Sequence, residues 1–87
     1  MTRFVRNPAA RIKRVGEKAA VYLPETGAVH VLNPTAELLF ESLAEPASLD
    51  ELVAVFEDLT DGDVTTIRDD LSQSLVDFEK LGISSVA

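Results

Sequence analysis

The sequence predicts an α+β fold in which a three-stranded antiparallel sheet is followed by three helices. Apolar and polar residues alternate through much of residues 9–32, as they do in strands with one buried face. From residue 34 onward, apolar residues recur at the three- and four-residue spacing of amphipathic helices. The connections are short and the 87 residues contain no internal repeat, so we expect a single domain with a small core.

The three predicted strands are separated by short turns and occupy residues 9–15, 18–23 and 28–32. The Gly-Glu pair at 16–17 is typical of a turn, which makes the first two strands a hairpin. In the second strand, Val21 and Leu23 share one face, which we expect to be buried. Gly27 in the next turn can adopt a positive φ. Residues 1–8 precede the strands and are expected to form a flexible or only loosely paired arm.

The first helix is expected to begin at the step from Asn33 to Pro34. The Asn33 side-chain oxygen can accept a hydrogen bond from a free N–H group of the first turn. Pro34 has the φ value that the first helical position requires. Leu38, Leu39 and Leu43 then recur at helical spacing, so this helix should bury one stripe of side chains.

Two further helices are predicted in the second half of the chain. One begins at Ser48, because Ser48 and Glu51 have the spacing of a capping box. The other, which is the longest, begins at Val64 and is expected to end at Gly82. The expected core positions of this third helix are Ile67, Leu71, Leu75 and Phe78. Residues 84–87 are expected to form a tail.

Charge is distributed unequally along the chain, whose formal net charge is −7. Six of the eight basic residues lie between residues 3 and 18, where only Glu17 opposes them. The other fourteen acidic residues follow residue 24, where the only basic residues are Arg68 and Lys80. The helical part should therefore repel polyanions such as nucleic acid.

Composition argues against several classes of function. The chain has no cysteine, which excludes disulfides, thiolate metal sites and cysteine nucleophiles. His30 is the only histidine, and no serine has a base at a recognisable spacing, so we expect no catalytic activity, metal or cofactor. Neither a membrane span nor a signal peptide is recognisable, so a cytoplasmic protein is expected.

Three stretches of the sequence carry a resemblance to a known family. They are LNPTA at 32–36, SLDEL at 48–52 and the third helix from Asp63 to Ile83. The first is similar to the strand-to-helix signature LNxTA of the PqqD-like family, and the others resemble the beginning of its second helix and its third helix. This family comprises the RiPP recognition elements, which bind the leader segment of ribosomally made peptide precursors. The resemblance covers roughly residues 9–83 and departs from the family at 44–47, where many members have Asp-Gly.

The resemblance implies a winged helix-turn-helix-like domain that is a non-catalytic adaptor. It implies a free-standing protein that binds a precursor leader peptide and presents it to a maturation enzyme. That enzyme would be a leader peptidase in lasso-peptide pathways, or a radical enzyme in pathways such as quinone cofactor maturation. In the family, the leader adds as a strand beside the third strand and lies against the third helix. The peptide-binding residues implied here are Ala28, Val29, His30, Val31, Leu32, Arg68, Asp69, Leu71, Ser72, Leu75 and Val76.

Some positions in this expected site have a second interpretation. Val76 lies off the core stripe, so it is either a wall of the groove or an ordinary exposed apolar residue. Arg68 is a partner for an acidic leader residue, for Asp69 or for solvent. His30 is a cross-strand or ligand-facing side chain on the third strand.

The topology alone also fits a winged-helix nucleic-acid-binding regulator. A recognition helix needs Lys and Arg side chains for phosphates and base edges. The third helix and its cap carry five acidic residues against two basic ones, so we expect no nucleic acid as a partner, and only the basic N-terminal strands leave that alternative open. Since no membrane span is recognisable, no membrane partner is expected either.

Overall fold

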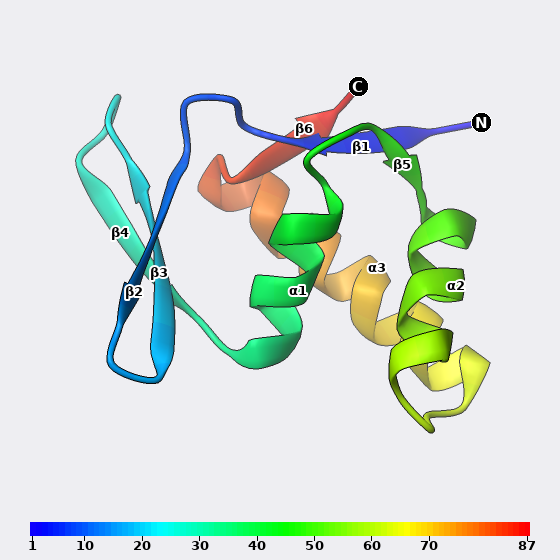
Figure 1. The fold of residues 1–87 in the computed structure, drawn as a ribbon. Coiled ribbons are helices and arrows are strands. Elements are labelled where there is room, and N and C mark those ends of the chain that lie inside the picture. The colour runs from blue at the N-terminus through cyan, green and yellow to red at the C-terminus, as the bar shows by residue number, and fades with distance from the viewer.

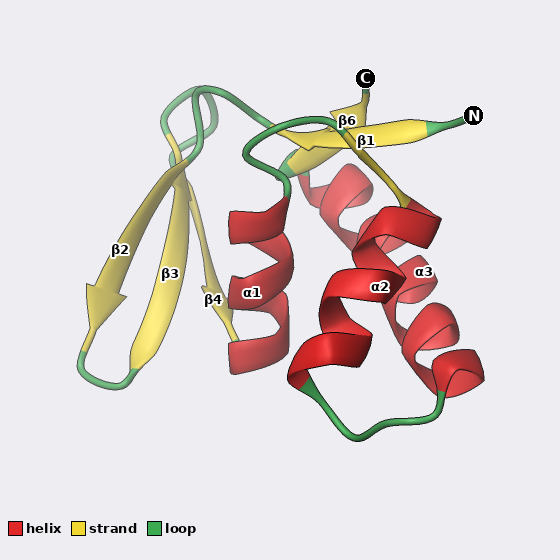
Figure 2. Ribbon diagram, turned by 45° about the vertical axis from the view of Figure 1, so that its right-hand side comes forward, coloured by secondary structure: helices red, strands yellow, loops and turns green.

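The computed structural model describes all residues, 1–87, and contains three helices and two three-stranded antiparallel sheets (Figures 1 and 2). The strands are β1 (Arg3–Arg6), β2 (Arg11–Val15), β3 (Lys18–Leu23), β4 (Ala28–Leu32), β5 (Ala47–Ser48) and β6 (Ser84–Val86). The helices are α1 (Pro34–Ser42), α2 (Leu49–Leu59) and α3 (Val64–Leu81). The α+β prediction is confirmed. The α2–α3 pair, together with the β2–β3–β4 sheet, is compatible with a winged helix-turn-helix-like arrangement.

The first sheet contains the three strands that the sequence predicts, in the order β2–β3–β4. Val21 in β3 pairs with His30 in β4, and Ala19 pairs with Leu32. Ala19, Val21 and Leu23 are buried, as their alternation predicts. Because β4 pairs with β3 alone, its other side is a free strand edge.

The second sheet corrects two expectations, the flexible arm at residues 1–8 and the tail at 84–87. Part of each segment is a strand: β1 lies between β5 and β6, and Phe4 pairs with both Ala47 and Val86. Arg6 of β1 also lies over the ring of Phe40 in α1, at 5.0 Å from its centroid. The sequence does not reveal this sheet, because strands of two to four residues are too short to show a periodic pattern.

A single cluster of buried apolar side chains joins the β2–β3–β4 sheet to the helices. Figure 2 shows α1 between that sheet and the pair formed by α2 and α3. The buried helical residues are Leu39 and Phe40 of α1, Leu52, Val53 and Phe56 of α2, and Ile67, Leu71, Leu75 and Phe78 of α3. The four core positions expected in the third helix are therefore confirmed.

The expected helix caps are all present. The N–H of Ala36 donates to Asn33 Oδ1 at 2.8 Å. The capping box of α2 has both of its hydrogen bonds, from the Glu51 N–H to Ser48 Oγ at 3.2 Å and from the Ser48 N–H to Glu51 Oε1 at 3.0 Å. Gly82 ends α3 in the left-handed conformation, with a φ of 79°.

The capping box makes stability depend on pH. Hydrogen bonds with the backbone and side chain of Ser48 lower the pKa of Glu51 below its ordinary value of 4.5. A lowered pKa means that this carboxylate stabilises the fold above its unfolded pKa, and that the contribution is lost as the pH falls through the folded pKa. We therefore expect urea melts to show a smaller loss of stability between about pH 6 and about pH 3 for Glu51→Gln than for the parent. Equal losses would contradict a role for the ionised carboxylate.

Candidate functional site

A groove of about 400 Å³ lies between the β4 strand and the C-terminal half of α3. Its residues come from β4, from the beginning of α1, and from α3 and the segment that follows it. They are Val29, His30, Val31, Leu32, Asn33, Ala36, Ser74, Asp77, Phe78, Leu81 and Ile83. We call this hollow the strand–helix groove.

The strand side of the groove is an apolar strand without a second neighbour. Val29 and Val31 are 59% and 66% exposed, whereas Leu32 is buried. His30 is half-buried, pairs with Val21 across the sheet and also lines the groove. The unpaired N–H and C=O groups of such an edge are a template for another extended chain.

The helix side of the groove is one face of α3. Ser74, Asp77, Phe78 and Leu81 occupy positions i, i+3, i+4 and i+7, so they lie along the same side of the helix. Phe78 is buried, and Leu81 is 44% exposed. Asp77 accepts a hydrogen bond from Gln73 Nε2 at 3.1 Å and pairs with no cation. This wall therefore combines apolar surface with an available negative charge.

The structure brings together the strand part of the expected site but not its helix part. Four of the five expected β4 residues line the strand–helix groove, and Ala28 begins the same strand. None of the six expected α3 residues lines it. Leu71 and Leu75 are core residues, and Arg68 forms an ion pair with Asp50 of α2 at 2.5 Å rather than with Asp69.

The other three expected α3 residues, Asp69, Ser72 and Val76, lie farther round the helix. Successive residues of an α-helix are rotated by about 100°, so residues two apart point to nearly opposite sides. Val76 thus points away from Phe78 and the groove, and it is 46% exposed. Helical spacing indicates which stripe is buried, but it does not show which flank of that stripe faces β4. The flank of Ser74, Asp77 and Leu81 was missed for this reason.

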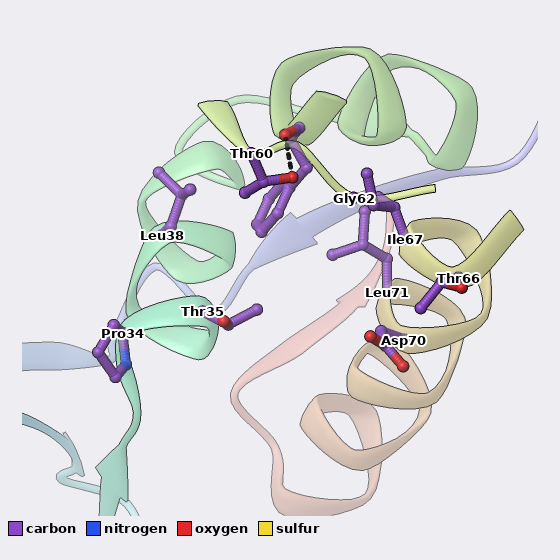
Figure 3. A pocket seen from close by; sticks show the side chains of 10 residues that line it. Pro34, Thr35, Leu38, Thr60, Gly62, Thr66, Ile67, Asp70 and Leu71 are labelled. Carbon is purple, nitrogen blue, oxygen red and sulfur yellow. Dashed lines mark hydrogen bonds between the residues drawn. The ribbon is translucent and has the colours of Figure 1, made fainter. Parts of the chain in front are cut away.

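A second hollow, of about 370 Å³, lies where the N-terminal end of α1 faces the end of α2 and the first half of α3 (Figure 3). Its walls are mainly apolar. They are formed by Pro34, Thr35, Leu38, Phe56, Thr60, Gly62, Thr66, Ile67, Asp70 and Leu71. We call this hollow the helix-end cavity.

Two further observations concern metal-binding groups and membrane-spanning helices. No group of three or more His, Cys, Asp or Glu side chains is placed to hold a metal ion. None of the helices has the length and apolar character needed to cross a membrane.

Comparison with known protein families gives a match that covers most of the chain. The family model described as coenzyme PQQ synthesis protein D (PqqD) matches residues 19–83. No curated protein and no solved structure matches the chain. The matched segment contains β4, all three helices and therefore both walls of the strand–helix groove.

Proposed function

Since this chain belongs to the PqqD family, we propose that it is a non-catalytic adaptor for the biosynthesis of a ribosomally made peptide product. It binds the leader segment of the precursor peptide and presents that peptide to a maturation enzyme, such as a leader peptidase or a radical enzyme. This step takes place in the cytoplasm, where ribosomal precursors are made.

The observation that carries the proposal is the free edge of β4 beside the strand–helix groove. An extended peptide in this groove would pair its backbone with β4 and become the next strand of the β2–β3–β4 sheet. Main-chain hydrogen bonds give such strand addition its affinity, and pockets for alternate side chains give it specificity. The buried Phe78 and the half-buried His30 offer contacts for the side chains that point inward.

The proposed contact set keeps the β4 residues expected from the sequence and changes those of α3. Ser74, Asp77, Phe78 and Leu81 replace the six α3 residues expected earlier, because they line the same groove as β4. Arg68 already has Asp50 as an ionic partner, so it is not required for an acidic leader residue.

Amide hydrogen exchange, with and without a synthetic peptide that has the leader sequence of a candidate precursor, tests the proposal. Strand addition should slow the exchange of outward-pointing β4 amides at least about tenfold when the protein is saturated with peptide. The β2 strand is a matched control, because it is the other edge of the same sheet. Protection at β2 instead of β4 would contradict the proposed site.

Binding to DNA distinguishes the adaptor from the alternative, a winged-helix regulator that binds nucleic acid. The α3 helix carries Asp69, Asp70, Asp77 and Glu79, so we expect duplex DNA to bind no more tightly than nonspecific contacts allow, with a Kd of about 10⁻⁴ to 10⁻⁶ M at physiological salt. Gel-shift titration checks this. A sequence-dependent complex with a Kd below about 10⁻⁷ M would favour the regulator over the adaptor.

A further inference from the structure

We propose that the helix-end cavity binds a large apolar side chain, called the anchor, of the same peptide that pairs with β4. A Lys or Arg residue next to the anchor in that peptide forms an ion pair with Asp70. This inference rests on the proposed function and adds to it the chemical class of leader that the chain selects. The anchor belongs to the part of the peptide that continues past the Leu32 end of β4.

The first argument is that two helices, α1 and α3, contribute residues to both the cavity and the groove. On α3, Asp70 and Leu71 line the cavity, and Ser74, one turn later on the same side, lines the groove. At the beginning of α1, Pro34 and Thr35 line the cavity, whereas their neighbours Asn33 and Ala36 line the groove. A chain lying in the groove is thus led directly to the cavity.

The spacing of the two hollows along α3 sets the position of the anchor. The α3 residues that line the cavity lie between Thr66 and Leu71, and those that line the groove lie between Ser74 and Leu81. The midpoints of these two stretches are about nine residues apart. Nine helical residues span about 13 Å, which an extended peptide covers in about four residues. The anchor should therefore lie about four residues from the middle of the strand that pairs with β4.

The second argument is the chemistry of the cavity walls. Figure 3 shows Thr35 and Leu38 on α1 across the hollow from Ile67 and Leu71 on α3. The Thr60 hydroxyl donates to the backbone carbonyl of Phe56 at 2.9 Å, so this polar group already has a partner. The volume of about 370 Å³ is sufficient for one Leu, Phe or Tyr side chain, and it lies within the range of ligand pockets.

Gly62 helps to keep the cavity open. A Cβ atom at this position would approach Cγ1 of Ile67 at 3.3 Å and Oγ1 of Thr60 at 3.6 Å. The backbone of Gly62 has no positive φ, so its conformation does not itself require glycine. The missing side chain instead leaves space among the residues that line the cavity.

The third argument is charge. Asp70 lines the cavity and Asp77 lines the groove, and neither belongs to the two ion pairs of the chain, Arg14–Glu37 and Arg68–Asp50. No Lys or Arg lines either hollow. A cationic side chain beside the anchor would complement Asp70, and one in the segment that pairs with β4 would complement Asp77. A second copy of this chain is a poor occupant, because each copy carries a net charge of −7.

Selection from a phage-displayed library of random 16-residue peptides tests the inference with defined probes. The library is panned against the parent, against Thr66→Trp and against Thr65→Trp. Both threonines are exposed near the beginning of α3, but only Thr66 lines the cavity, so Thr65→Trp is the matched control. Thr35→Trp fills the cavity from the α1 side, and it is used as well in case Thr66→Trp does not fold.

We expect peptides selected by the parent to carry an aromatic or large aliphatic residue, with Lys or Arg next to it, about four residues from an alternating apolar segment. The same peptide, synthesised and titrated, should bind Thr66→Trp and Thr35→Trp about 10- to 100-fold more weakly, and Thr65→Trp as tightly as the parent. Replacing the anchor residue of the peptide by Ala should weaken its binding to the parent by a similar factor and should change its binding to Thr66→Trp little.

The remaining outcomes separate the two proposals. If the parent selects peptides that protect β4 but Thr66→Trp and Thr35→Trp bind them as Thr65→Trp does, the anchor inference is overturned and the adaptor function stands. Selection of Asp or Glu beside the anchor would also overturn it. If the parent selects no peptide and does not bind the leader, the adaptor function fails and this inference fails with it.

Discussion

Proline at Val29 and proline at His30 should have opposite consequences. One of the two variants should unfold, and the other should fold but bind leader peptide about five- to 150-fold more weakly than the parent. The reason is that consecutive residues of an edge strand direct their N–H groups to opposite sides. One of these two N–H groups therefore faces β3, and the other faces the free edge of β4.

The physical effect of each substitution follows from the donor that proline removes. Loss of the N–H that faces β3 breaks the ladder of the β2–β3–β4 sheet, and proline is tolerated on an edge strand only where the N–H points outward. Loss of the outward N–H leaves the protein intact, but it leaves a peptide carbonyl without its partner. Such an unpaired group costs about 1 to 3 kcal/mol.

Circular dichroism and calorimetric titration with the leader peptide distinguish the two variants. Each variant is the control for the other, because both introduce the same residue into the same strand. If both variants fold and bind like the parent, the peptide does not pair with β4.

The second large effect is expected at Ile83, which immediately precedes the segment 84–87 that was predicted to be a tail. Ile83 is completely buried in the main core, and Ile83→Ala should destabilise the fold by about 2 to 5 kcal/mol. Its backbone also holds the chain ends in place, because its N–H donates to the Phe78 carbonyl and its own carbonyl accepts from the Asn7 N–H, both at 2.8 Å.

Val86→Ala is the matched control for this prediction. Val86 lies three residues later, in β6, and its side chain is 53% exposed. An exposed position of this kind usually changes stability by less than about 0.5 kcal/mol. Urea melts of the two variants should therefore differ by at least about 1.5 kcal/mol. If Ile83→Ala is as mild as Val86→Ala, the C-terminal segment contributes little to the fold.

The residues that act on their near neighbours were predictable from the sequence. Asn33 and Ser48 begin helices through side chains that bond to N–H groups three residues later, so their pattern is complete within a few positions. The alternation of Val21 and Leu23 correctly indicates the buried face of β3. The apolar stripe of α3 is likewise visible in the sequence.

Features that depend on distant segments were not predictable in the same way. The pairing of Phe4 with Val86 joins opposite ends of the chain, and the sequence of neither short strand indicates with which strand it pairs. The α3 wall of the strand–helix groove depends on how β4 approaches a helix more than 30 residues later in the sequence. Periodicity identifies Phe78 as part of the buried stripe of α3. Whether the flank with Asp77 or the flank with Val76 faces β4 is decided by tertiary packing, which periodicity does not show.

The pairing of β1 with β6 also has a consequence for the order of folding. Bringing Phe4 to Val86 closes a loop of nearly the whole chain, whereas the β2–β3 and β3–β4 pairings close only short turns. The entropic cost of closure grows with loop length, so contacts between distant residues tend to form after local ones. The β5–β1–β6 sheet should thus assemble after the rate-limiting step, when α3 has already packed. On this pathway, destabilising substitutions in β1 or β6 would mainly accelerate unfolding and leave the refolding rate nearly unchanged.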